Sequence, residues 1–165
     1  MVSFVLLALA ASLVATTASQ AAIKAGADQG IEQSMVTLLN AYRADHGLAP
    51  LKINAALMRA ARAHSRDMVQ QHYFDHTALD GESFSQRLLR YGFDWTSAGE
   101  AIGQASGLTS PTSAADSAMQ MWRQSPPHNR ILLTAGFKAV GIGAWCSADT
   151  GGGSTCTFTL DAARG

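Results

Sequence analysis

The feature that most constrains this fold is Glu100, a carboxylate that stands among small and apolar residues in the segment 99–103. Burying a carboxylate without partners costs several kcal/mol, so the fold must bring polar groups to it. His76 and His128 are natural partners, because each also lies in an otherwise apolar piece. Two imidazoles and a carboxylate form a set that binds divalent cations or moves protons. Alternatively, Glu100 accepts hydrogen bonds from backbone amides only, and His76 is a surface loop residue.

Apolar residues recur at helical spacing in four stretches of the chain. The predicted helices cover 31–46, 54–71 with Asn54 as N-cap, a stretch from Asp80 or Ser83 to Gly92, and 112–124 with Ser110 as N-cap. A short helical turn follows from His128. We expect residues 22–30 to be a flexible lead-in and residues 104–111 to be a polar connector.

His64 lies on the apolar stripe of the second predicted helix, with Leu57, Ala61 and Met68. A single histidine on such a stripe is more often a hydrogen-bonded structural residue than a ligand. Both interpretations stay open here, and His64 is kept as a residue that lines the cleft.

Residues 139–146 and 155–161 alternate as two strands, joined by a glycine-rich tip. The alternation places Cys146 and Cys156 on the buried face of a hairpin, where they can form a disulfide. Closing so short a loop stabilises the fold by roughly 2–3 kcal/mol in the chain-entropy model. The alternative is two buried thiols. Gly141 and Gly143 indicate close approach of a helix or of the cavity wall. Helices interleaved with strands predict an α+β fold.

Residues 1–21 read as a signal peptide, because an apolar run is followed by small residues with a cleavage position after Ala21. No Lys or Arg precedes the run, so a retained N-terminal membrane anchor is the alternative. The 12 basic residues balance the 12 acidic ones, so no net charge attracts nucleic acid. We therefore expect a secreted, periplasmic or extracellular protein, with no nucleic-acid partner and no stable membrane insertion after signal removal.

Several motifs between Met35 and Leu160 follow one another in an order that is specific rather than generic. They are Leu39-Asn40-Ala41-Tyr42-Arg43, Ala61-Arg62-Ala63-His64-Ser65, Tyr73-Phe74-Asp75-His76-Thr77, Gly99-Glu100-Ala101-Ile102, Trp122-Arg123-Gln124-Ser125-Pro126-Pro127-His128-Asn129-Arg130 and Val140-Gly141-Ile142-Gly143. This series resembles the CAP superfamily, the group of cysteine-rich secretory, antigen 5 and pathogenesis-related-1 proteins, and within it the bacterial YkwD-like proteins with an SCP domain.

The resemblance implies a three-layer α-β-α sandwich with a twisted, mainly antiparallel sheet, here over residues 31–163. It also implies a central cleft in which His76, Glu100 and His128 are the metal ligands, with Zn²⁺ or another divalent cation as the expected cofactor. Larger eukaryotic relatives have a second glutamate three residues after a tryptophan. Ser125 stands at that position, counted from Trp122, so the expected metal site is weaker and has an open position.

The leading functional hypothesis is a secreted binding module whose cleft engages a lipid, a sterol or a partner protein in the envelope or outside the cell. The alternative is a metal-dependent, peptidase-like hydrolase that uses the same cleft. A ligating Glu100 cannot easily serve as a base, and a Ser125–His128 pair without an orienting acid is a weak sign of catalysis. Whether the protein is an enzyme, and which residues would be catalytic, stays open. A third possibility is a structural envelope protein in which the histidines stiffen the fold.

Overall fold

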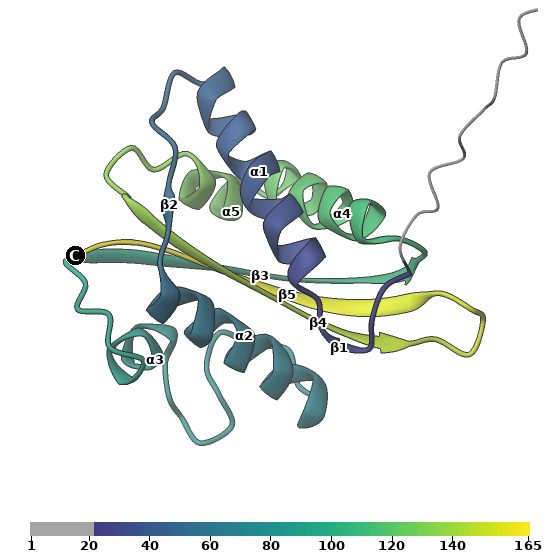
Figure 1. The fold of residues 1–165 in the computed structure, drawn as a ribbon. Coiled ribbons are helices and arrows are strands. Elements are labelled where there is room, and N and C mark those ends of the chain that lie inside the picture. The colour runs from purple at the N-terminus through teal and green to yellow at the C-terminus, as the bar shows by residue number, and fades with distance from the viewer. Residues whose placement is uncertain (1–21) are drawn as a thin grey trace, which may run out of the picture.

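Five helices and five strands make up residues 22–165, the part of the chain that this computed structural model describes (Figure 1). Their order is β1 Gly26–Ala27, α1 Gln29–Asp45, β2 Lys52–Ile53, α2 Ala55–Gln70, α3 Phe84–Arg90, β3 Ser97–Leu108, α4 Pro111–Gln124, α5 Pro126–Leu132, β4 Ala139–Ala148 and β5 Ser154–Arg164. The predicted signal peptide, residues 1–21, lies outside the described residues. Within those residues, no helix has both the length and the hydropathy to cross a membrane.

The strands form one sheet in the order β1-β4-β5-β3. The short strand β2 pairs with the first residues of β4, whereas β1 pairs with residues near its end. The β2 pairing is parallel and the others are antiparallel. The predicted hairpin is confirmed as β4 and β5, although both strands continue past their predicted ends. β3 lies at one edge of the sheet, which leaves its outer side open to residues from either layer of helices.

The expected polar connector at residues 104–111 is wrong, because residues 104–108 continue β3. Residues 97–105 pair in unbroken register with β5, and an irregularity follows between Ala105 and Leu108. Small and polar residues have weak intrinsic strand preference, and these residues show no alternation of apolar and polar side chains that would predict a strand. The ladder of hydrogen bonds to β5 determines the conformation here. Ser110 then caps α4 with Pro111 at its first position, as predicted.

Helices cover both faces of the sheet (Figure 1). α1, α4 and α5 lie on one side, and α2 and α3 lie on the other. The larger apolar core lies between the sheet and the first layer, and a smaller cluster around Leu57 and Leu88 lies under the second. The expected three-layer α-β-α sandwich is therefore confirmed.

The N-terminal segment joins the fold earlier than the sequence indicated. β1 pairs with the end of β4, within the expected lead-in of residues 22–30. The side chain of Asp28 then accepts hydrogen bonds from the backbone N–H groups of Gly30 and Ile31, so α1 begins at Gln29 rather than Ile31. A capping aspartate satisfies amides that would otherwise have no partner at a helix start, which explains the earlier beginning.

α2 packs directly on the backbone of β4. A Cβ atom on Gly141 would lie 2.1 Å from the carbonyl carbon of Leu57, and one on Gly143 would lie 2.4 Å from that of Ala61. No side chain fits there, so the two glycines let the main chains of helix and strand meet. The predicted close approach is confirmed, and it fixes the position of α2 over the sheet.

Cys146 and Cys156 form the predicted disulfide, near the end of the β4–β5 hairpin. The two residues are direct partners in the register, with a Cα–Cα distance of 4.1 Å. Both are buried, as the alternation of the strands indicated.

Candidate functional site

Glu100 belongs to a row of residues that crosses three strands on one face of the sheet. Its partner on β5 is Asp161, which in turn lies opposite Gly141 of β4. A Cβ on Gly141 would point at α2, so this row faces the α2 and α3 layer. The strand register thus places two carboxyl groups side by side beneath the helices.

Both carboxylate oxygens of Glu100 have a partner. Nδ1 of His76 donates to Oε1 at 2.8 Å, and Nη2 of Arg87 pairs with Oε2. The side chain of Glu100 is 1% exposed, so its charge is taken out of water almost completely. His76 is one of the two expected partners, whereas the second partner is Arg87 instead of His128.

His76 is presented from the loop between α2 and α3, and its side chain is 47% exposed. The hydrogen bond to Glu100 raises the pKa of His76 above its ordinary value, and partial burial opposes that effect. Since Nδ1–H donates to the carboxylate, Nε2 is the ring nitrogen left for another contact. Within residues 22–165, Nε2 forms no hydrogen bond.

Arg87 is one of two residues of this cluster that sequence reasoning missed. It comes from α3, its side chain is 2% exposed, and its Nε and Nη1 atoms have no hydrogen-bond partner among the described residues. The signal was its spacing, because Arg87 follows Phe84 by three positions and precedes Tyr91 by four. It therefore shares the apolar face of that short helix, where an arginine needs a buried counter-charge.

Asp161 is a second residue of the cluster that could not be identified from the sequence motifs. It is fully buried, and as a carboxylate neither of its oxygens has a hydrogen-bond donor among residues 22–165. Burial raises the pKa of Asp161 well above its ordinary value, and the charge of Glu100 raises it further while Arg87 acts against both. The neutral carboxylic acid can donate to Glu100, which resolves the missing partner. The available signal was strand parity, because Asp161 lies two positions after Thr159 and the two side chains therefore point to the same face of β5.

His64 approaches the same carboxylate from α2. Its Nε2 lies 4.0 Å from Oε1 of Glu100 and donates to the backbone oxygen of Asp75 at 2.9 Å. Burial lowers the pKa of His64 more than the nearby charges change it. A neutral ring with its proton on Nε2 fits these contacts. His64 thus lies beside the cluster and anchors the loop that carries His76.

His128 lies in α5, on the opposite side of the sheet from α2 and α3 (Figure 1). Its Nδ1 is buried and has no hydrogen-bond partner among the described residues. Burial lowers the pKa of His128, and the charge of His76 lowers it further. Among the described residues, the structure gives no hydrogen bond or ion pair between His128 and either His76 or Glu100.

Ser125 is the junction between α4 and α5, where it ends one helix and is the N-cap of the next. It borders a shallow hollow formed by α4, which includes Gln120 and Met121. Among residues 22–165, its side chain makes no capping hydrogen bond and no contact with His128 that would pair them.

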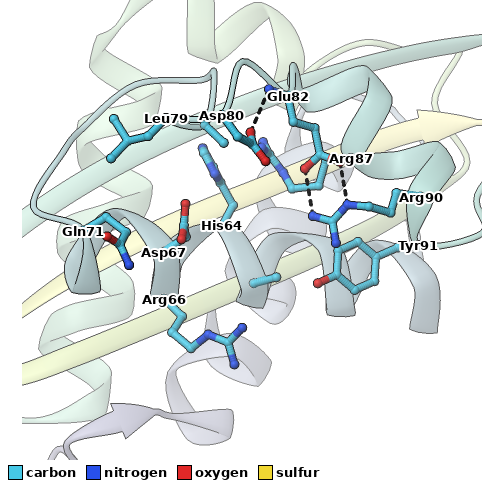
Figure 2. Close-up of a pocket in the computed structure, with 12 residues that line it drawn as sticks. His64, Arg66, Asp67, Gln71, Leu79, Asp80, Glu82, Arg87, Arg90 and Tyr91 are labelled. Carbon is cyan, nitrogen blue, oxygen red and sulfur yellow. Dashed lines mark hydrogen bonds and ion pairs between the residues drawn. The ribbon is translucent and has the colours of Figure 1, made fainter.

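A polar hollow of about 310 Å³ lies between α2, α3 and the intervening loop, and His64 and Arg87 form part of its lining (Figure 2). The ion pair of Glu82 and Arg90 forms part of its wall. Across the described part of the chain, no three His, Cys, Asp or Glu side chains are arranged to hold a metal ion. The predicted metal set of His76, Glu100 and His128 accordingly stays a prediction.

Comparison with protein families gives a match between residues 36–159 and the CAP model, the cysteine-rich secretory protein family. The protein YkwD of Bacillus subtilis is 34% identical over 112 residues, which are 68% of this chain and 41% of YkwD. The membrane protein YlbC of the same organism is 30% identical over 112 residues, or 68% of this chain and 31% of YlbC. The chain thus matches less than half the length of either relative.

Solved structures share the fold. An extracellular protein containing a SCP domain from Bacillus anthracis superposes with a TM-score of 0.70 at 27% identity, covering 84% of this chain and 41% of that chain. An outer surface protein from Borrelia burgdorferi gives a TM-score of 0.67 at 18% identity, covering 88% and 99%. At 18% identity the second likeness concerns the fold alone.

Proposed function

The chain belongs to the cysteine-rich secretory protein (CAP) family, and on that premise we propose that it is an exported binding module whose cleft holds a divalent cation and a ligand. The resemblance identified from its motifs is thereby confirmed at the level of the family. The name of the Bacillus anthracis neighbour, which is 27% identical, describes that protein as extracellular. We extend that location to this chain, and we propose a lipid, a sterol or a partner protein of the envelope as the ligand.

One observation carries this proposal: His76 is held by its Nδ1 atom, while its ring is half exposed. Histidines that bind metals usually donate their other ring N–H to a carboxylate or carbonyl, which fixes the ring and its tautomer. Glu100 provides that acceptor, and Arg87 holds Glu100 in place. This arrangement supports Glu100 as the group that orients His76, rather than as a ligand itself.

His128 supports the same site from α5. A buried ring nitrogen without a partner costs about 1–3 kcal/mol, and a cation or a ligand donor would remove that cost. The lowered pKa of His128 favours the neutral imidazole, which is the form that binds metals. The residues therefore fit a two-histidine site completed by water or by the ligand. A bound cation would supply a positive centre for an oxygen atom of that ligand.

The hydrolase alternative has no comparable support. Both oxygens of Glu100 are engaged by His76 and Arg87, which leaves this carboxylate poorly placed to act as a base. Ser125 forms no activating pair with His128 among the described residues. We therefore propose binding rather than catalysis as the role of the cleft.

Thermal unfolding of residues 22–165 with and without Zn²⁺ tests the proposal. At a Zn²⁺ concentration of about 100 times Kd, binding stabilises by about 2.7 kcal/mol, or a Tm increase of roughly 5–10 °C. The increase should disappear in a His76→Ala, His128→Ala double variant. His72→Asn is the matched control, because His72 is exposed and has a positive φ of 57° that asparagine tolerates.

Metal content measured after dialysis separates binding at the cleft from general stabilisation. Equal stabilisation of the wild type and the double variant, or none of the wild type, would contradict the metal site. Export has an independent test, since expression of the full chain in a secreting bacterial host should give a mature protein that begins at Ala22.

A further inference from the structure

Three arginines line one side of α2, away from the Glu100 cluster. Arg59, Arg62 and Arg66 are separated by three and four positions, so they follow one face of the helix over about 10 Å. Figure 2 shows Arg66 projecting away from His64. We call these three residues the arginine stripe.

The stripe concentrates positive charge in a chain whose total charge is zero. Arg62 pairs with the buried carboxylate of Glu32, and its side chain remains 35% exposed. Within residues 22–165, Arg59 and Arg66 have no carboxylate at ion-pair distance, and both are exposed. Arg59 donates instead to the backbone oxygen of Tyr91 at 3.1 Å. Two of the three guanidinium groups are therefore free to meet an anion from outside.

Arg66 lines the edge of the polar hollow beside His64, and the stripe borders two further hollows that meet at α2. One, of about 310 Å³, is lined by all three arginines together with the rings of Tyr91 and Trp145. The other, of about 660 Å³, lies between α1 and α2 and also includes Arg59 and Arg62. Two recesses that share the same cations form a path for an extended ligand rather than a pocket for a single ion.

The chemistry of the stripe selects a class of ligand. Guanidinium groups bind carboxylates and phosphates in a bidentate manner, and half-buried tyrosine and tryptophan rings offer an apolar surface with a polar rim. A chain of sugar rings that carry acidic groups satisfies both features at once. We propose that the arginine stripe, with Tyr91 and Trp145, binds an anionic polysaccharide along α2.

A flat anionic membrane fits this surface less well. The aromatic rings line a recess instead of projecting from the molecule, so they are poorly placed to enter a bilayer, whereas a polymer strand can enter the recess. Binding at this surface does not depend on His76 or His128 and is therefore a separate activity from that proposed for the cleft.

Affinity measurements with polygalacturonate, and with neutral dextran of similar size, test the proposal on residues 22–165. We expect the wild type to bind polygalacturonate and not dextran. An Arg59→Gln, Arg66→Gln variant should bind on the order of tenfold more weakly, and its dependence on salt should be shallower, because fewer counterions are released. Neither arginine has a carboxylate partner to lose, so the fold should be unaffected.

The matched control is Arg123→Gln, Arg130→Gln, which removes the same charge from α4 and α5 on the other face. It should retain the wild-type affinity. Trp145→Leu should weaken binding while leaving the salt dependence unchanged. Equal loss in both double variants, unchanged affinity in Trp145→Leu, no binding of polygalacturonate, or binding only to vesicles of anionic phospholipid would each overturn the proposal.

Discussion

Replacing Arg87 by methionine asks how strongly the buried charge of Glu100 depends on its counter-charge. The side chains of Arg87 and Glu100 are 2% and 1% exposed, and methionine fills the space with a flexible apolar chain. Removing one member of a buried ion pair costs about 3–5 kcal/mol, because the other charge is left uncompensated. His76 would still contact Oε1, but its half-exposed ring is screened by water and replaces little of the lost interaction.

Thermal unfolding of Arg87→Met, Glu100→Gln and the double variant measures this dependence. For Arg87→Met, a loss of about 3–5 kcal/mol corresponds to a Tm lowered by roughly 6–20 °C. The double variant should lose less than Arg87→Met alone, because the uncompensated charge is gone. Arg90→Met is the control, since its pair with Glu82 is 56% and 17% exposed and should be worth at most about 1 kcal/mol.

The reasoning fails if Arg87→Met is no more destabilising than Arg90→Met. It also fails if the losses of the two single variants simply add in the double variant, because independent sites add and coupled partners do not.

Three further outcomes follow from the fold. Gly143→Ala should cost about 3 kcal/mol or more, because its Cβ would lie 2.4 Å from the backbone of Ala61, whereas Gly136→Ala meets nothing within 4 Å; thermal unfolding of both variants compares them. Reducing the Cys146–Cys156 bond should lower the free energy of unfolding by roughly 2–3 kcal/mol, and reductant should have no effect on a variant with both cysteines replaced by serine. Because the pKa of Asp161 is raised in the folded state, its contribution to stability is present at low pH and is lost as pH rises above the unfolded value of about 3.9. In Asp161→Asn this loss should be absent from a plot of unfolding free energy against pH, and parallel plots for variant and wild type would contradict the neutral carboxylic acid.

Much of the fold could be predicted from the sequence, because its local signals agree with its packing. The capping residues Asn54 and Ser110, the apolar stripes and the strand parity of the two cysteines each matched the structure. β3 escaped prediction, because residues 97–108 carry no alternation and depend on β5 for their conformation. A short-range pattern cannot indicate a pairing partner that lies 46 to 67 residues further along the chain, as the partners of β3 do.

The candidate site was predictable only in part. A buried carboxylate demanded partners, and His76 was correctly expected at Glu100. Arg87 and Asp161 were missed, because their burial depends on how a short helix and an inner strand face the same row of the sheet. Which cation meets a buried anion is decided by tertiary geometry, whereas the need for a partner is decided by desolvation alone.

The direct contact between α2 and β4 makes the two walls of the polar hollow beside His64 unequally adaptable. Since main chain meets main chain at Gly141 and Gly143, α2 cannot tilt or slide without a collision, and His64 stands on a rigid support. His76 belongs to the loop of residues 71–83, which has no part in that contact. Changes in the shape of that hollow therefore fall to the loop, and substitutions there can alter it while α2 keeps its place.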